Sequence, residues 1–155
     1  MLLRRRPRRT ASASVEFAVC LPFLCTILLG IWDLGRLIEV NQLLSNAARE
    51  GCRQASTAQD SASDVQAAVQ NYLNRAGVNT TGMTVTVANL TSAGNSDPRN
   101  ANQLDLLSVT VTLPANNVRF ILAGNLPGAS ALTASSVWMS MRDIPVGQLG
   151  GIPQG

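Results

Sequence analysis

Glu16 is the residue of this chain whose chemistry most needs explaining. It carries the last charge before an uncharged, largely apolar run over residues 17–32. An ionised side chain in a bilayer costs about 2.5 kcal/mol or more at the centre and less towards the edge, so an acid beside such a run indicates a partner charge. The chemistry predicted here is charge pairing at a membrane surface.

Arginines give the stretch before this acid a strongly basic start. There are five of them, Arg4, Arg5, Arg6, Arg8 and Arg9. Arginines that flank a membrane-spanning helix mark its cytoplasmic side. The uncharged run covers roughly 24 Å as a helix, short of the ~30 Å hydrocarbon core, so the small residues 11–15 must extend it. The pattern predicts a membrane anchor with a basic cytoplasmic flank.

Three interpretations of this stretch stay open from the residues alone. A cleaved secretory signal peptide should end in an A-x-A-like site, whereas residues 30–35 read GIWDLG. A plain uncleaved anchor explains every feature except Glu16. A type IV prepilin-like leader is cut on the cytoplasmic side of the apolar run. Its signature is a basic leader, a small residue at the cut and a glutamate as the fifth residue of the mature chain.

Two separated blocks of sequence narrow this choice. Residues 11–22 read ASASVEFAVCLP and residues 44–53 read LSNAAREGCR, with Gly30, Asp33 and Gly35-Arg36 between them. In their order and spacing the blocks resemble the TadE-like family, the pseudopilins of the Tad (Flp, type IVb) pilus and secretion apparatus. The resemblance covers about a third of the chain, from Arg8 to Arg53.

The resemblance implies a protein that is processed at its N-terminus. A prepilin peptidase would cut between Ala11 and Ser12, where the family more often has glycine before the cut and alanine is still small. Glu16 would become the fifth mature residue, and its carboxylate would pair with the new amine of Ser12 on a neighbouring subunit. Loss of the five leader arginines would change the formal charge from +3 to −2, so the basic balance does not indicate nucleic-acid binding.

The resemblance also implies partners and a location. The partners would be the prepilin peptidase, other Tad pilins and pseudopilins, the inner-membrane platform and the membrane itself, without nucleic acid. The chain would cross the bacterial inner (cytoplasmic) membrane once, with its N-terminus in the cytoplasm and its C-terminal domain exported to the periplasm or cell surface. The alternative is an uncleaved, single-pass envelope protein whose exported domain binds a ligand or partner.

Composition argues against an enzyme. The chain has no histidine, and all twelve basic residues are arginine, so the usual general base and the usual metal ligand are both missing. No Gly-rich phosphate loop, Ser/His/Asp constellation or metal-ligand spacing is present, and we expect no cofactor. Cys20 and Cys25 lie in the apolar run, while Cys52 is predicted to be an inert thiol rather than an intermolecular disulfide. Asp97, Asp105 and Asp143 are predicted to face solvent.

Helical periodicity continues beyond the apolar run. The predicted helix extends to Ala55, and its outer half carries an apolar stripe that a domain or partner helix would cover. The stripe consists of Leu34, Leu37, Ile38, Asn41, Leu44, Ala48 and Cys52. Residues 46–53 are predicted to supply packing and surface pairs. A second helix is expected over residues 62–76, capped by Asp60 or Ser61 and stopped by Gly77.

The period then changes from helical to two. Residues 83–87 and 107–113 alternate apolar side chains with Thr or Ser, which is typical of half-buried antiparallel strands, and residues 132–142 are predicted to form a third strand. A turn-rich linker separates the first two, and residues 118–122 form a short apolar piece. We predict an α+β fold in which a long N-terminal transmembrane helix continues into a pilin-like domain with a second helix and a small antiparallel sheet.

The expected organisation follows from these elements together with the implied cut. It comprises a basic prepilin-like leader over residues 1–11, a transmembrane anchor over 12–32, an exported TadE-like domain over 33–143 and a flexible tail over 144–155.

Overall fold

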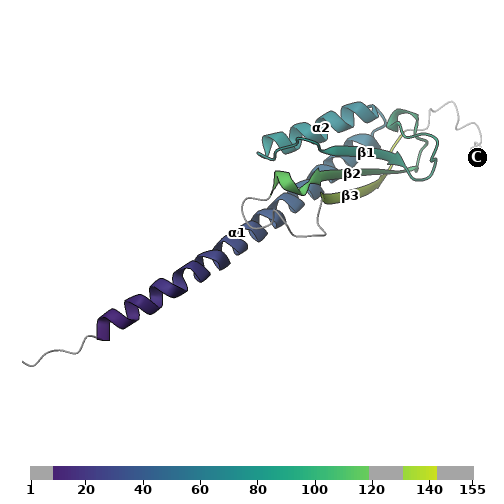
Figure 1. Ribbon diagram of the computed structural model, residues 1–155. Coiled ribbons are helices and arrows are strands. Elements are labelled where there is room, and N and C mark those ends of the chain that lie inside the picture. Colours follow the sequence, from purple (N-terminus) through teal and green to yellow (C-terminus); the bar gives the residue numbers. More distant parts are fainter. Residues whose placement is uncertain (1–8, 119–130, 143–155) are drawn as a thin grey trace, which may run out of the picture.

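A computed structural model describes residues 9–118 and 131–142 (Figure 1). In chain order, the elements are α1 (Arg9–Ser56), α2 (Ala62–Arg75), β1 (Thr84–Asn89), the short 3-10 helix η1 (Pro98–Asn100), β2 (Leu106–Pro114), the 3-10 helix η2 (Ala115–Asn117) and β3 (Ala131–Met139). α1 forms a long rod, and the other elements gather around its C-terminal half (Figure 1). The fold is α+β, as predicted.

α1 is one helix of 48 residues that passes through Pro22 without a break. Proline cannot donate the backbone hydrogen bond expected inside a helix, and its ring crowds the preceding turn. One turn later, the Thr26 hydroxyl donates a hydrogen bond to the Pro22 carbonyl oxygen at 2.9 Å. Because α1 is unbroken, the prediction that the helix continues from the apolar run into its outer half is confirmed.

The start of α2 is fixed by a capping box. The Ser61 hydroxyl accepts the Asp64 backbone N–H, and the Asp64 carboxylate accepts the Ser61 backbone N–H at 3.0 Å. Each bond satisfies a donor that the first helical turn would otherwise leave unpaired. Gly77, with φ of +75°, ends the helix in a conformation that L side chains rarely adopt. Both predicted boundary residues, Ser61 and Gly77, are confirmed.

The three strands form one antiparallel sheet in the order β1-β2-β3. On the inner face of the central strand β2, alternate apolar side chains are buried; they are Leu107, Val109, Val111 and Leu113. On the outer face, Thr110 and Thr112 lie within hydrogen-bond distance of Ser135 and Thr133 across the ladder. The period-two pattern thus separates a face that packs on the helices from a face bonded by hydroxyl groups.

The core lies between the inner face of the sheet, α2 and the outer half of α1. From α1 it receives Val40, Leu44, Ala47, Ala48, Cys52 and Ala55, and from α2 it receives Val65, Val69 and Leu73. Gly51 lies in close contact with both neighbouring layers, because a Cβ there would be 2.7 Å from Val69 Cγ2 and 3.2 Å from Val109 Cγ1. The absent side chain at this position lets α1 approach both neighbours.

Two expectations about the outer half of α1 and the end of the sheet need correction. Within the predicted apolar stripe, Leu44, Ala48 and Cys52 are buried, but Leu34 and Ile38 are each 61% exposed. They lie on a different face of α1 from Asp33 and Val40, which are buried. Asn41 is exposed as well. The third strand ends at Met139, three residues before the predicted 142.

Several remaining expectations concern particular segments of the chain. A helical turn occurs at η2, just before the short apolar piece predicted at 118–122, most of which lies outside the described residues. The predicted leader, except for its last residues, and the predicted tail over 144–155 also lie outside them.

Candidate functional site

The predicted processing and assembly residues lie at the free end of α1. Ala11 and Ser12 belong to the first turn of the helix, which starts at Arg9, and Glu16 follows one turn later with an exposed side chain. In Figure 1 this end of α1 lies far from the folded domain. Arg4, Arg5, Arg6 and Arg8 lie outside the described residues. The helical spacing places Ser12 and Glu16 about 6 Å apart along the axis.

Exposed apolar side chains cover the helix beyond Glu16. Large hydrophobic residues from Phe17 to Trp32 are between 41% and 74% exposed. In the part of the chain that the structure describes, α1 is the one helix long and apolar enough to cross a membrane. Monomeric soluble proteins rarely expose a continuous apolar surface of this size, and this half of α1 is compatible with a single-pass membrane anchor.

Charges return where α1 approaches the domain. Asp33 is 7% exposed although it lies between exposed Trp32 and Leu34. The Arg36 guanidinium is 2.9 Å from the Glu39 carboxylate, an ion pair one helical turn in length. The first charges beyond the apolar run are therefore either buried or paired.

Residues 46–53 combine core packing with a surface ion pair, as predicted. Ala47, Ala48 and Cys52 are fully buried, whereas Arg53 is exposed and lies 2.6 Å from the Glu50 carboxylate. The hydrogen bond from Arg53 lowers the pKa of Glu50, although partial burial opposes this. The block stabilises the contact between α1 and the domain and has no catalytic arrangement.

Cys52 is a buried thiol within the interface between α1 and the sheet. Its Sγ donates a hydrogen bond to the Ser136 carbonyl oxygen of β3 at 3.0 Å. Burial raises the pKa of this thiol, an effect that the contacts with Ser136 and Val109 only partly offset. The raised pKa and the absence of solvent contact agree with the predicted inert thiol.

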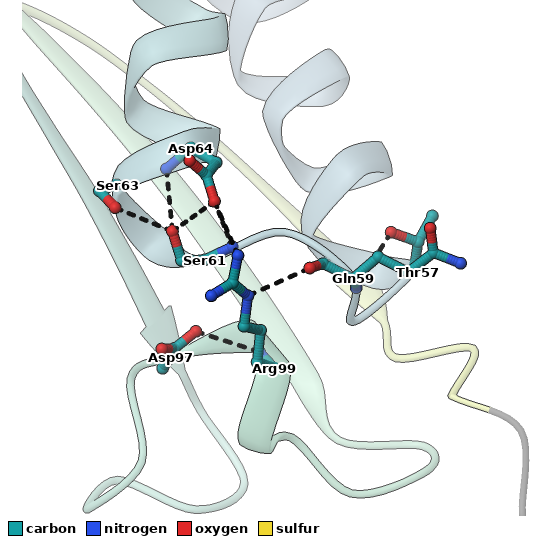
Figure 2. Close-up of polar contacts among 7 residues, drawn as sticks. All are labelled: Thr57, Gln59, Ser61, Ser63, Asp64, Asp97 and Arg99. Carbon is teal, nitrogen blue, oxygen red and sulfur yellow. Dashed lines mark hydrogen bonds and ion pairs between the residues drawn. The ribbon is translucent and has the colours of Figure 1, made fainter.

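A polar network ties the linker after α1 to the loop between β1 and β2 (Figure 2). Arg99 Nε donates to the Gln59 carbonyl oxygen and Arg99 Nη2 to the Asp64 carboxylate, each at 3.1 Å. The Asp97 carboxylate accepts the Arg99 backbone N–H. The hydrogen bonds from Ser61 hold the pKa of Asp64 below its ordinary value. These hydrogen bonds join the linker after α1, the start of α2 and the loop between β1 and β2, which indicates a structural role for the network.

Asp105 corrects a prediction, because it does not face solvent. Its side chain is 4% exposed and accepts hydrogen bonds from Asn89 Nδ2 at 2.8 Å and from the Asn102 backbone N–H at 2.9 Å. These bonds lower the pKa of the carboxyl group, with the Asn89 bond the largest contribution. Asn89 in turn accepts two backbone N–H groups with its Oδ1. Asp143 lies outside the described residues, and Asp97 caps η1.

The chemical capacity of the described residues is small. Within 9–118 and 131–142 there is no group of three or more His, Cys, Asp or Glu side chains that could hold a metal ion. The carboxylates of Asp64 and Asp105 accept several hydrogen bonds each, so they are occupied in holding turns. What the arrangement offers is an apolar rod with an acid near its free end and a small domain at the other.

Three residues important to this architecture were missed from the sequence. Gly51 could have been found, since an isolated glycine inside a helix costs about 1 kcal/mol and usually has a packing reason. Nothing in the sequence pattern indicated that Asp105 is buried, because its burial depends on a partner 16 residues away in the chain. Arg99 likewise reaches across 35 residues to Asp64.

Comparison with known proteins supports the resemblance over the N-terminal third. Residues 11–53 match the model of a family described as TadE-like protein, which confirms the resemblance for this segment. The match covers almost the whole of α1 and stops before α2 and the sheet. Neither the curated proteins nor the solved structures gave a match to the chain.

Proposed function

We propose that this chain is a pseudopilin, a structural component of a Tad (Flp, type IVb) pilus assembly and secretion system. The observation that carries the proposal is the match of residues 11–53 to the TadE-like family. The matched segment is the exposed apolar helix together with the packing block that attaches it to the domain. The lack of a catalytic cluster among the described residues is consistent with a structural role.

The proposed maturation begins at the free end of α1. A prepilin peptidase cuts between Ala11 and Ser12, where the first helical turn has unpaired backbone N–H groups and opens at little cost. The leader arginines Arg4, Arg5, Arg6, Arg8 and Arg9 hold this end in the cytoplasm until the cut. The helix then crosses the inner membrane once, with the domain on the exported side.

The proposed role of Glu16 is to set register between subunits. After cleavage, the amine of Ser12 is positive, and the exposed Glu16 carboxylate can pair with this amine on an adjacent pilin or pseudopilin. Pairing lets the two opposite charges offset each other at the edge of the apolar run, whereas either charge alone would carry its full desolvation cost. The inner-membrane platform would be the further partner of such an assembly.

The experiment that tests the proposal is the intact mass of the protein purified from membranes, with and without the cell's prepilin peptidase. We expect a chain that starts at Ser12 only when the peptidase is present. A chain that keeps Arg4 to Arg9 in both strains would favour an uncleaved envelope protein whose exported domain binds a ligand or partner. A chain that starts beyond Trp32 would indicate a secreted domain and overturn both.

A further inference from the structure

We propose that lipid contact on α1 continues past the uncharged run and ends at Ile38, so that the outer boundary of the membrane lies there and not at Trp32. The inference rests on the proposed membrane anchoring and concerns where that anchoring ends. In this segment, α1 contacts the acyl chains of lipids in the outer leaflet.

A continuous strip of exposed apolar side chains runs along α1 into the segment before the domain. The strip consists of Ile27, Ile31, Leu34 and Ile38, which are 44%, 61%, 61% and 61% exposed. Their spacing of four, three and four residues keeps them within about 60° of one another on a helix of 3.6 residues per turn. The two outer members continue the surface of the two that lie in the uncharged run.

The charges of this segment do not interrupt the strip. At about 100° per residue, Asp33, Arg36 and Glu39 all lie roughly 110° or more from the centre of the strip. Asp33 is buried at 7% exposure, and Arg36 and Glu39 form an ion pair at 2.9 Å. A long arginine side chain can also reach the headgroups while its stem stays on apolar surface. Charge therefore does not prevent this face from meeting lipid.

Helix length favours the same boundary. From Phe17 to Ile38 the rise is roughly 33 Å, close to the ~30 Å hydrocarbon core, whereas an end at Trp32 gives only about 24 Å. With the outer boundary at Ile38, the missing length is supplied on the exported side. Glu16 then stays at the cytoplasmic interface, where a carboxylate is far less costly than in hydrocarbon. Cover over α1 begins on another face, where Asp33 and Val40 are buried and Leu37 is half-buried, while the strip stays exposed as far as Ile38.

The test is a depth measurement on the full chain. Cys20 and Cys25 are replaced by alanine, and Cys52 is kept because it is fully buried and will not take a label. Spin labels are then attached in separate variants carrying Ile27→Cys, Leu34→Cys, Ile38→Cys or Gln42→Cys. Gln42 is the matched control, since it is exposed on the same side of α1 one turn beyond Ile38. Each variant is reconstituted at low protein density in phosphatidylethanolamine and phosphatidylglycerol vesicles.

The readout compares relaxation by oxygen, which concentrates in lipid, with relaxation by a water-soluble nickel chelate. We expect oxygen to relax the labels at 27, 34 and 38 more strongly and the chelate to relax the label at 42 more strongly. The ratio of oxygen relaxation to chelate relaxation should fall about tenfold between 38 and 42, which corresponds to 1.4 kcal/mol. If 34 and 38 behave like 42 while 27 favours oxygen, the boundary lies near Trp32 and the inference is overturned, although the anchoring stands. Shielding of 34 and 38 from both reagents would show a protein neighbour instead of lipid and also overturn it. Preference for the chelate at 27 would overturn the anchoring itself.

Discussion

Gly51 of α1 lies directly against Val69 of α2, so closely that a Cβ at position 51 would be 2.7 Å from Val69 Cγ2. Val109 Cγ1 of β2 would be 3.2 Å from the same Cβ, so a side chain at position 51 would press on both α2 and the sheet. The contact between the two helices and the sheet is set by this missing side chain.

Replacement of Gly51 by alanine is therefore expected to destabilise the protein. Although alanine favours a helix, overpacking of a filled core costs about 1–3 kcal/mol, and we expect the loss to exceed the gain. Urea unfolding of the full chain in detergent micelles measures the effect. Gly35→Ala is the matched control, because nothing lies within 4 Å of a Cβ at that helical glycine. Equal unfolding midpoints for both variants would contradict the packing argument.

Loss of the Asn89 side chain is expected to weaken the domain more than loss of an exposed asparagine. Asn89→Ala removes the donor to buried Asp105 and the acceptor of two backbone N–H groups, and unsatisfied buried groups cost about 1–3 kcal/mol. Asn100→Ala, an exposed change in the same loop region, is the comparison. Unfolding midpoints of the two variants within error of each other would argue against a structural role for the pair.

Stability is expected to fall in acid. The pKa values of Asp64 and Asp105 are both lowered in the folded chain from an ordinary value of 3.8, mainly by hydrogen bonds from Ser61 and Asn89. A lowered folded pKa gives stability that is present above the unfolded pKa and is lost as the pH falls through the folded pKa. The urea midpoint should thus be level near pH 6 and decline below about pH 4.

Ser61→Ala tests the contribution of the cap to this behaviour. It removes the largest cause of the shift at Asp64 and an N-cap whose loss costs about 1 kcal/mol. We expect a lower midpoint at pH 6 and a shallower decline between pH 4 and pH 3 than in the unaltered chain. An unchanged slope would assign the acid sensitivity to Asp105 or to other carboxylates.

The thiol of Cys52 is expected to resist alkylation in the folded protein. It is fully buried, its pKa is raised by burial, and it donates to the Ser136 carbonyl oxygen. In a variant with Cys20→Ala and Cys25→Ala, mass spectrometry after maleimide treatment should show one added group only when urea is present. Rapid labelling in buffer would mean that α1 separates from the sheet, and an intermolecular disulfide would then become available.

Removal of the Glu16 carboxylate is expected to abolish assembly of pili while leaving cleavage of the leader unchanged. In cells that depend on this chain for piliation, Glu16→Ala should still yield a mature chain starting at Ser12 but should abolish pili, seen by electron microscopy. Glu39→Ala, which removes an exposed acid paired with Arg36 on the same helix, should leave piliation intact. Normal piliation with Glu16→Ala would mean that the acid merely lies at the headgroups.

Sequence periodicity predicted much of this fold because the relevant forces act locally. The length of α1, the Ser61 cap and the alternation in β2 each depend on residues within a few positions of one another. Burial on α1 was harder to predict, since Leu34 and Leu44 are equally apolar and only the position of the domain decides that one is exposed and the other buried. Asp105 was misjudged for the same reason, because it lies in the loop before β2 and its partner Asn89 is at the end of β1.

The candidate site was also predictable from the sequence only in part. Ala11, Ser12 and Glu16 could be singled out from the order of charge, small residues and apolar run, and the family match over residues 11–53 agrees with that choice. The peptidase cut and the ion pair between subunits remain predictions, because both involve a second protein.

The unbroken course of α1 has a mechanical consequence. The same 48-residue helix carries the exposed apolar half and the half packed under the sheet, with no linker between them in the described chain. Side chains on a helix keep fixed angles about its axis, so the direction in which Glu16 points is fixed relative to the side of α1 on which the sheet packs. A neighbour that binds the anchor in one orientation therefore also orients the domain.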